Sequence, residues 1–145
     1  MSEQFTFGGK SYYKPHGMRS ELSPEEAAHN LSQLEFCEKD SALLAKVPVD
    51  FDVCHAIHQS LVALKFDTES QVLTDFSPMY LRATFSGGNV NHIPAFALQM
   101  PGSYEGLELV FNPIGAKKLE RGGIKNDALQ NFCEKNSHER GLRLT

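Results

Sequence analysis

Residues 52–66 read DVCHAIHQSLVALKF, and residues 79–85 read MYLRATF. The first stretch repeats apolar residues every three or four positions, which is the spacing of one face of a helix of about 14 residues. The second stretch alternates large apolar with polar side chains, as a half-buried strand does. We therefore expect a helix that packs on one face of a sheet. That helix should bury Val53, Ile57, Leu61 and Leu64 together.

The segment before this helix carries two local folding signals. Residues 5–13, FTFGGKSYY, place two short aromatic runs around a Gly-Gly pair, and this pattern predicts a β-hairpin. Farther along, Ser23 can cap a helix, Pro24 suits its first position, and Glu26 completes a capping box. Apolar residues at helical spacing extend this predicted helix to about Cys37, and residues 41–46 are expected to form a further short helical turn.

The second half of the chain is expected to begin as sheet and to end as helix. Alternating or continuous apolar runs, separated by glycine-containing turns, predict an antiparallel three-stranded meander. Its strands are expected around residues 80–85, 94–100 and 107–111. Two short helices, at about 116–119 and 126–133, are expected to follow.

The order of these elements indicates one α+β domain that comprises residues 1–145. The chain has 145 residues, 41% of them hydrophobic, which is enough to fill a single core. The predicted order, in which helices come first, the sheet second and further helices last, differs from a regular βαβ alternation. The expected architecture is an antiparallel sheet of three to five strands, packed against the N-terminal helices, with short C-terminal helices.

Composition favours a cytoplasmic protein. The N-terminal MSEQFTFGGK has no basic region followed by an apolar one, and no apolar run approaches about 18 residues, so neither secretion nor a membrane is expected. The three cysteines are odd in number and widely spaced, which suits free thiols in a reducing compartment. No basic stripe with interleaved aromatic residues points to direct nucleic-acid binding. No cofactor is expected.

Charge is distributed unevenly along the chain, whose net charge is −4. Between residues 21 and 75 there are eleven acidic and three basic residues. Such a block can be a solvated helix surface, or it can steer a basic protein partner. On the second alternative the chain is a small non-catalytic regulatory protein, of the inhibitor or immunity type, that presents an acidic helical surface. The partner-binding residues would then be Glu25, Glu26, Glu35 and Glu38.

Cys54 stands at the start of the helix in residues 52–66, together with two histidines. Cys54 and His58 are one helical turn apart, but zinc needs three or four ligands and no second pair at ligand spacing exists, so no metal site is expected. A thiol in the first turn of a helix is also favoured as thiolate by the helix dipole. The alternative is that Cys54 is a small buried apolar residue of the core.

Two residues downstream of Cys54 extend the thiolate interpretation. His92 stands at the entry to an apolar run, and Asn112 ends the strand expected at residues 107–111. This order of Cys, His and Asn resembles papain-like thiol hydrolases, which include peptidases, amidases and deamidases. The resemblance implies that Cys54 attacks a carbonyl group, that His92 is the base, and that Asn112 orients the imidazole ring.

Overall fold

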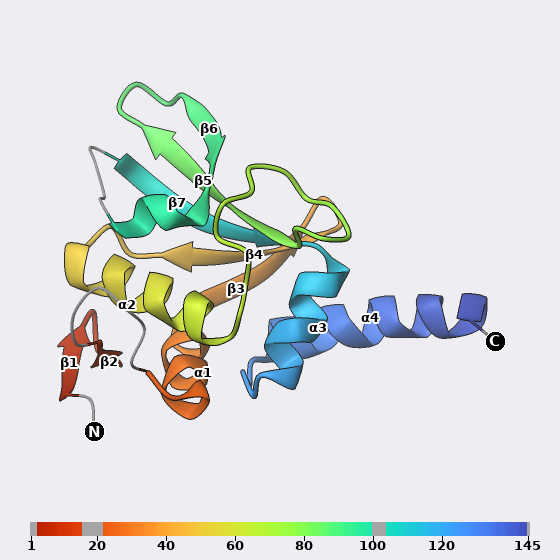
Figure 1. The fold of residues 1–145 in the computed structure, drawn as a ribbon. Helices are drawn as coiled ribbons and strands as arrows, with labels where there is room; N and C mark the ends of the chain where they lie inside the picture. Colours follow the sequence, from red (N-terminus) through yellow and green to blue (C-terminus); the bar gives the residue numbers. More distant parts are fainter. Residues whose placement is uncertain (1–2, 16–21, 100–103, 145) are drawn as a thin grey trace.

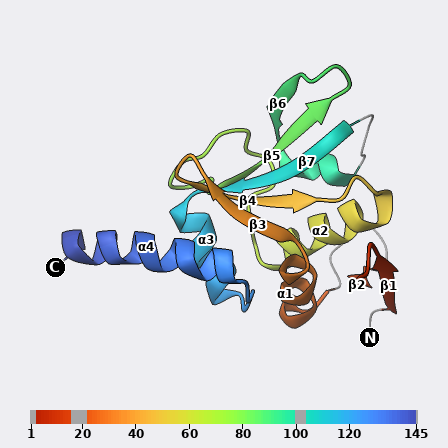
Figure 2. The same cartoon turned by 180° about the vertical axis from the view of Figure 1, so that it is seen from behind.

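A five-stranded antiparallel sheet with helices packed on one side forms the body of the molecule, and a separate two-stranded hairpin lies at its N-terminal end (Figure 1, Figure 2). The computed structural model describes residues 3–15, 22–99 and 104–144, and of residues 137–144 it describes the backbone alone. This architecture confirms the predicted α+β class.

The five strands of the main sheet are not arranged in sequence order. They are β3 (Glu35–Lys39), β4 (Ala42–Val47), β5 (Met79–Phe85), β6 (Val90–Ile93) and β7 (Tyr104–Phe111). Their order in the sheet is β3-β4-β7-β5-β6, and every neighbouring pair is antiparallel. The strand that comes last in the chain therefore occupies the centre of the sheet, between β4 and β5.

The predicted meander is wrong in one strand. Residues 94–100 were expected to pair between the other two strands, but β6 ends at Ile93 and a short 3-10 helix, η1 (Ala95–Gln99), follows. Pro94 has no backbone N–H to donate to a neighbouring strand, and its carbonyl oxygen accepts from the N–H of Ala97 at 3.0 Å. The chain thus turns away from the sheet, which leaves β7 free to pair with β4 and β5.

The predicted helix through Cys37 is too long, and the short helical turn expected at residues 41–46 is wrong. Helix α1 (Pro24–Ser32) ends five residues before Cys37, and β3 and β4 then form a hairpin. Asp40 and Ser41 make its two-residue turn with φ of 53° and 65°. Such a turn usually contains glycine, because a positive φ is costly for other residues, and its absence hid the hairpin in the sequence.

Helix α1 begins where the sequence places its cap. Ser23 and Glu26 close the predicted capping box of α1, and Asp50 accepts from the N–H of Val53 to cap the next helix.

None of the described helices is long and apolar enough to cross a bilayer. The remaining helices are α2 (Phe51–Ala63), α3 (Pro113–Arg121) and α4 (Asp127–Leu144), the last much longer than expected.

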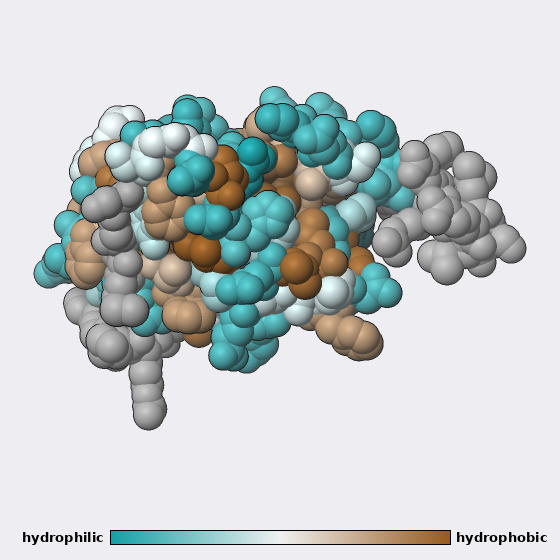
Figure 3. All heavy atoms as spheres, turned by 90° about the horizontal axis from the view of Figure 1, so that it is seen from above, coloured by the Kyte–Doolittle hydropathy of each residue, from teal (hydrophilic) through white to brown (hydrophobic). Residues whose placement is uncertain are grey.

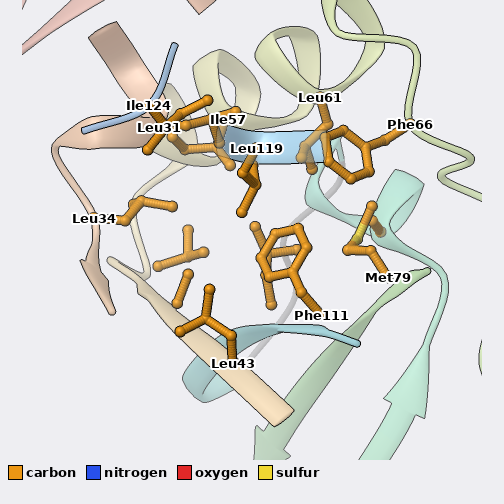
Figure 4. Packing of buried hydrophobic residues seen from close by; sticks show 14 of the residues in the cluster. Leu31, Leu34, Leu43, Ile57, Leu61, Phe66, Met79, Phe111, Leu119 and Ile124 are labelled. Carbon is orange, nitrogen blue, oxygen red and sulfur yellow. The ribbon is translucent and has the colours of Figure 1, made fainter. Parts of the chain in front are cut away.

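Helix α2 packs its apolar face against the sheet, as expected. Val53, Ile57 and Leu61 have no exposed surface, while Leu64, at the end of the helix, is half-buried against the same cluster. Figure 4 shows side chains from α1, α2, α3 and the strands converging in this core. On the strands, alternate residues face the core, for example Leu43, Met79 and Phe111. These alternate positions define the core face of the sheet.

The N-terminal hairpin consists of β1 (Glu3–Phe7) and β2 (Lys10–Lys14) and confirms the aromatic Gly-Gly signal. It is fixed to α1 by Asn30, which is fully buried. The Asn30 side chain accepts from the backbone N–H of Tyr13 at 2.6 Å and donates to its carbonyl oxygen at 3.0 Å. The same amide group donates to the hydroxyl of Ser60 on α2 at 3.0 Å. One side chain thus joins the hairpin to two helices.

Candidate functional site

Cys54 lies in the core. Its side chain has no exposed surface, and its thiol donates to the carbonyl oxygen of Pro48 at 3.4 Å. Burial, helped by the negative charge of Asp50, raises the pKa of the thiol to about 11, which outweighs the favourable backbone contact at the helix start. At neutral pH the group is therefore a protonated thiol, and solvent does not reach it.

His92 lies on the other face of the sheet. It is directly opposite Arg82 in the β5–β6 register, and directly paired residues point to the same face. Arg82 alternates with Leu81 and Ala83, which face the core and α2, so the imidazole of His92 points away from Cys54. The His92 ring is exposed and its centre lies 4.5 Å from that of Tyr80.

Asn112 caps a helix. Its side-chain oxygen accepts from the N–H of Gly115 at 2.9 Å at the start of α3, and its amide nitrogen donates to the carbonyl oxygen of Thr74 at 3.0 Å. These bonds use both ends of the side chain. The structure therefore does not bring Cys54, His92 and Asn112 together, although their order along the chain resembles that of papain-like hydrolases.

His58, the second residue of the possible metal pair, is also buried. The amide nitrogen of Gln99 lies 3.1 Å from Nε2 of His58. Burial, with a smaller contribution from the charge of His55, lowers the pKa of His58 to about 4, so its imidazole is neutral at pH 7. In the part of the chain that the structure describes, no three His, Cys, Asp or Glu side chains gather as metal ligands would.

Two of the acidic residues lie in the first turn of α1. Glu25 is exposed, while a carboxylate oxygen of Glu26 accepts from the N–H of Ser23 at 2.9 Å within the capping box. Negative side chains are favourable at this end of a helix because of its dipole. Glu26 therefore has a structural role, and Glu25 is available to a partner.

The other two acidic residues lie on a strand rather than on a helix. Glu35 and Glu38 belong to β3, because α1 ends at Ser32. Glu38 forms an ion pair with Lys135 of α4 at 2.9 Å, whereas Glu35 is exposed and lies opposite Lys46 in the β3–β4 register. The acidic surface is thus divided between α1 and β3.

A groove between the N-terminal hairpin and the main sheet was not predicted as a site, although Glu35, one of the predicted partner-binding residues, lines it. It encloses about 350 Å³, a volume at the lower end of the range for ligand pockets. We call it the hairpin groove. It is lined by Phe7, Gly8, Lys10 and Tyr12 of the hairpin and by residues 33–35, 46–49 and 105–107.

The floor of the hairpin groove is apolar and its rim is charged. Tyr12, Leu34, Val47 and Leu107 line it with side chains that are at most 3% exposed. The rim contains two exposed apolar residues, Phe7 and Val49, among four charged ones. Those charged residues are Lys10, Glu35, Lys46 and Glu105. The groove can therefore accept an apolar group that is flanked by charged groups.

The sequence signal for this groove is weak because its lining comes from four distant segments. Glu35 was singled out for its charge and Phe7 and Tyr12 as hairpin aromatics, but nothing in their spacing shows that they share a groove with residues 105–107. Their proximity depends on the docking of the hairpin by Asn30 and on the central place of β7.

Comparison with protein-family models, with curated proteins and with solved structures finds no match for this chain.

Proposed function

We propose that this chain is a non-catalytic protein-interaction domain, with a regulatory or inhibitory role, that binds a basic segment of a partner protein in the hairpin groove. The observation that supports the proposal most is the groove itself, which combines a buried apolar floor with a charged, open rim. Apolar pockets with a few polar groups at the edge are the usual form of a binding site.

The chemistry of the partner follows from the rim. An apolar side chain of the partner would enter the groove, and lysine or arginine residues beside it would meet the carboxylates of Glu35 and Glu105. Of the two lysines at the rim, Lys46 lies between Glu35 of β3 and Glu108 of β7 in the sheet, so neighbouring carboxylates offset its charge. The chain's net charge of −4 would increase the rate at which a basic partner meets the molecule.

The environment of the thiols supports a cytoplasmic location, which is part of the same proposal. None of the three cysteines, Cys37, Cys54 and Cys133, forms a disulfide bond. Free cysteines are usual in proteins of reducing compartments. The burial of Cys54 supports an interaction protein over a thiol hydrolase, because a nucleophile must be reachable by its substrate.

A displayed peptide library tests this proposal. Peptides selected on the protein are expected to carry an apolar residue flanked by Lys or Arg, and their affinity should fall as salt rises, because salt screens exposed charges. Glu105→Lys and Val49→Arg, which change the rim and not the floor, are expected to weaken binding at least tenfold.

The matched control changes charge away from the groove. Glu69→Lys and Asp75→Lys replace exposed acids in the loop before β5 and are expected to leave peptide affinity nearly unchanged. If the rim variants bind the selected peptides as tightly as the wild type, the hairpin groove is not the binding site. Selected peptides without basic residues would contradict the basic partner.

A further inference from the structure

The N-terminal hairpin is a sheet of its own, and its two edges have different surroundings. The edge formed by β2 lies against α1, where the carbonyl oxygen of Ser11 is 3.0 Å from Nε2 of His29. On the same edge, Asn30 bonds to both backbone groups of Tyr13. Figures 1 and 2 both show β1 on the outer side of the hairpin, away from α1. We call the side of β1 (Glu3–Phe7) that is turned away from β2 the hairpin edge.

Two residues of β1 turn their backbone groups toward the hairpin edge. In an antiparallel pair, directly opposite residues alternate between exchanging both backbone hydrogen bonds and pointing both groups outward. Tyr13 bonds to α1 and not to β1, so its register partner Gln4 also points its N–H and C=O outward. The same holds for Thr6, whose register partner Ser11 turns its carbonyl oxygen to α1. The hairpin edge therefore presents two donors and two acceptors.

These backbone groups are available to a ligand. Gln4 and Thr6 are both exposed. Within residues 3–15, 22–99 and 104–144, β2 is the one strand that pairs with β1, and no other backbone group bonds to Gln4 or Thr6. An extended segment of another protein can bond to such an edge as an added strand, which is a common mode of peptide recognition.

The two edges of the main sheet are protected in ways that the hairpin edge is not. Proteins shield edge strands with charged side chains, with lysine and proline, and by keeping the strands short. Three of the five residues of β3 are charged, and Lys135 of α4 pairs with Glu38 at 2.9 Å. Strand β6 has four residues and stops before Pro94, and on the side of the β5–β6 turn hydrophilic residues interleave with apolar ones (Figure 3). Strand β1 has five residues without lysine or proline, and it pairs with β2 without a register shift.

An aromatic face connects the hairpin edge with the hairpin groove. Phe5 and Phe7 lie on one face of β1, because alternate residues of a strand point the same way. Tyr12 lies opposite Phe5, and the centres of their stacked rings are 5.5 Å apart. Phe7 and Tyr12 both line the groove. A strand added at the hairpin edge therefore has every second side chain on the face that opens into the groove.

We propose that the basic partner segment binds in extended form, as a third strand along the hairpin edge, with alternate side chains directed to the hairpin groove. The inference rests on the proposed function and adds the conformation of the ligand. Bonds to the backbone of Gln4 and Thr6 supply affinity that does not depend on sequence, while the groove selects side chains. The apolar residue and the basic residues that meet Glu35 and Glu105 are then spaced at every second position.

The charge of the groove favours a basic segment over β1 of a second copy. Exposed edge strands also pair with each other, so a second copy is the main alternative. Strand β1 carries one acid, Glu3, and no base. A second copy would thus bring a carboxylate to a rim that already holds Glu35 and Glu105, whereas lysine or arginine brings the opposite charge.

Backbone methylation of a bound peptide tests the added strand. The probe is the tightest-binding peptide from the displayed library, synthesised with an N-methyl group on one backbone nitrogen at a time. In a strand, every second residue turns its N–H toward the neighbouring strand. Methylation at those positions is expected to weaken binding about tenfold, because it removes a donor and obstructs the approach of β1, while methylation between them changes affinity less than about twofold.

Thr6→Pro makes the matching change in the protein. The N–H of Thr6 points away from β2, so proline removes an outward donor without removing a bond of the hairpin. This variant is expected to bind the unmethylated peptide about tenfold more weakly. Thr6→Val, which keeps the N–H, is the control and should bind as the wild type does. Hydrogen exchange in β1 and β2 measures whether the hairpin is intact, and if proline disrupts it, the methylation series on the wild type decides.

A methylation series without alternation, or a Thr6→Pro variant with an intact hairpin that binds as tightly as the wild type, would overturn the added strand. If Glu105→Lys still weakened binding in that case, the groove would remain the binding site, so that the two proposals can fail separately. Sedimentation equilibrium of the free protein is expected to give the mass of one chain. A dimer that the peptide does not dissociate would place a second copy on the hairpin edge and would also overturn the proposal.

Discussion

At the scale of single residues, Cys54 illustrates how burial overrides a favourable local position. The first turn of a helix lowers the pKa of a thiol, but the core around Cys54 excludes the water that would solvate a thiolate. Burial, helped by the negative charge of Glu120, also raises the pKa of Cys133 to about 11. Cys37 on β3 is exposed.

The labelling of the three thiols follows from their exposure. In dilute native protein at neutral pH, iodoacetamide is expected to alkylate Cys37 first and to reach Cys54 and Cys133 on unfolding, because a buried thiol is neither solvated nor accessible. Mass spectrometry of tryptic peptides measures the order. In the control, Cys37→Ser, the native protein should take up no fast label. Rapid labelling of Cys54 in the native protein would show that solvent reaches this thiol and would support its interpretation as a nucleophile.

His58 makes stability depend on pH. Burial lowers its pKa from the usual 6.5 to about 4, so the unfolded chain binds a proton more tightly than the folded one. Above pH 6.5 His58 is neutral in both states and the folded protein keeps its full free energy of unfolding. As the pH falls through 6.5 toward 4, protons bind to the unfolded chain first, and the free energy of unfolding falls by up to about 3 kcal/mol. Urea unfolding at several pH values measures this loss. His58→Gln should reduce the slope of the free energy of unfolding against pH between pH 4 and 6.5. An unchanged slope would mean that His58 is not the group responsible.

At the scale of elements, the packing of α2 on the sheet depends strongly on the side chain of Leu61. Its side chain is fully buried in the core cluster. Leu61→Ala is expected to lower the free energy of unfolding by roughly 2–5 kcal/mol, because it leaves a cavity among side chains that cannot collapse to fill it. Thermal or denaturant unfolding measures the change. Val62→Ala, on the exposed side of the same helix, serves as the control and should cost much less.

The docking of the hairpin should depend on Asn30. Asn30→Ala removes two hydrogen bonds between the hairpin and α1 and a third between α1 and α2, so that the backbone groups of Tyr13 lose their partner on α1. Hydrogen exchange is expected to accelerate in β1 and β2 while the main sheet stays protected. Glu25→Ala, at an exposed position of the same helix, is the control. Equal protection of the hairpin in both variants would mean that other contacts hold it.

Local signals in the sequence predicted the elements that are stabilised locally. The capping box at Ser23, the Gly-Gly turn of the first hairpin and the face of α2 all depend on residues within a few positions of one another. The β3–β4 hairpin was not predicted because its turn residues, Asp40 and Ser41, adopt positive φ angles, which a sequence signals reliably only through glycine or asparagine. The apolar run after Ile93 was read as a strand because its hydrophobicity does not distinguish η1 from a buried strand.

At the scale of the whole molecule, the sequence could not predict which strands pair. The insertion of β7 between β4 and β5 depends on contacts between residues that are far apart in the chain, such as Leu43 with Phe111. The hairpin groove arises from that arrangement, since it combines residues of β4 with residues of β7. The candidate surfaces are therefore properties of the assembled fold, whereas Cys54, His92 and Asn112 were grouped by their order alone.

The central position of β7 has a consequence for how the protein is made. When residues 1–99 have left the ribosome, β3, β4, β5 and β6 are available but β7 is not, so β4 and β5 each present the edge that β7 pairs with in the complete sheet. Such edges recruit other strands and chaperones. Nascent chains stalled when residue 99 has just left the exit tunnel are expected to be digested rapidly by protease. Chains released from the exit tunnel through residue 144 are expected to resist, and equal resistance of the two would show that the outer strands fold before the middle of the sheet exists.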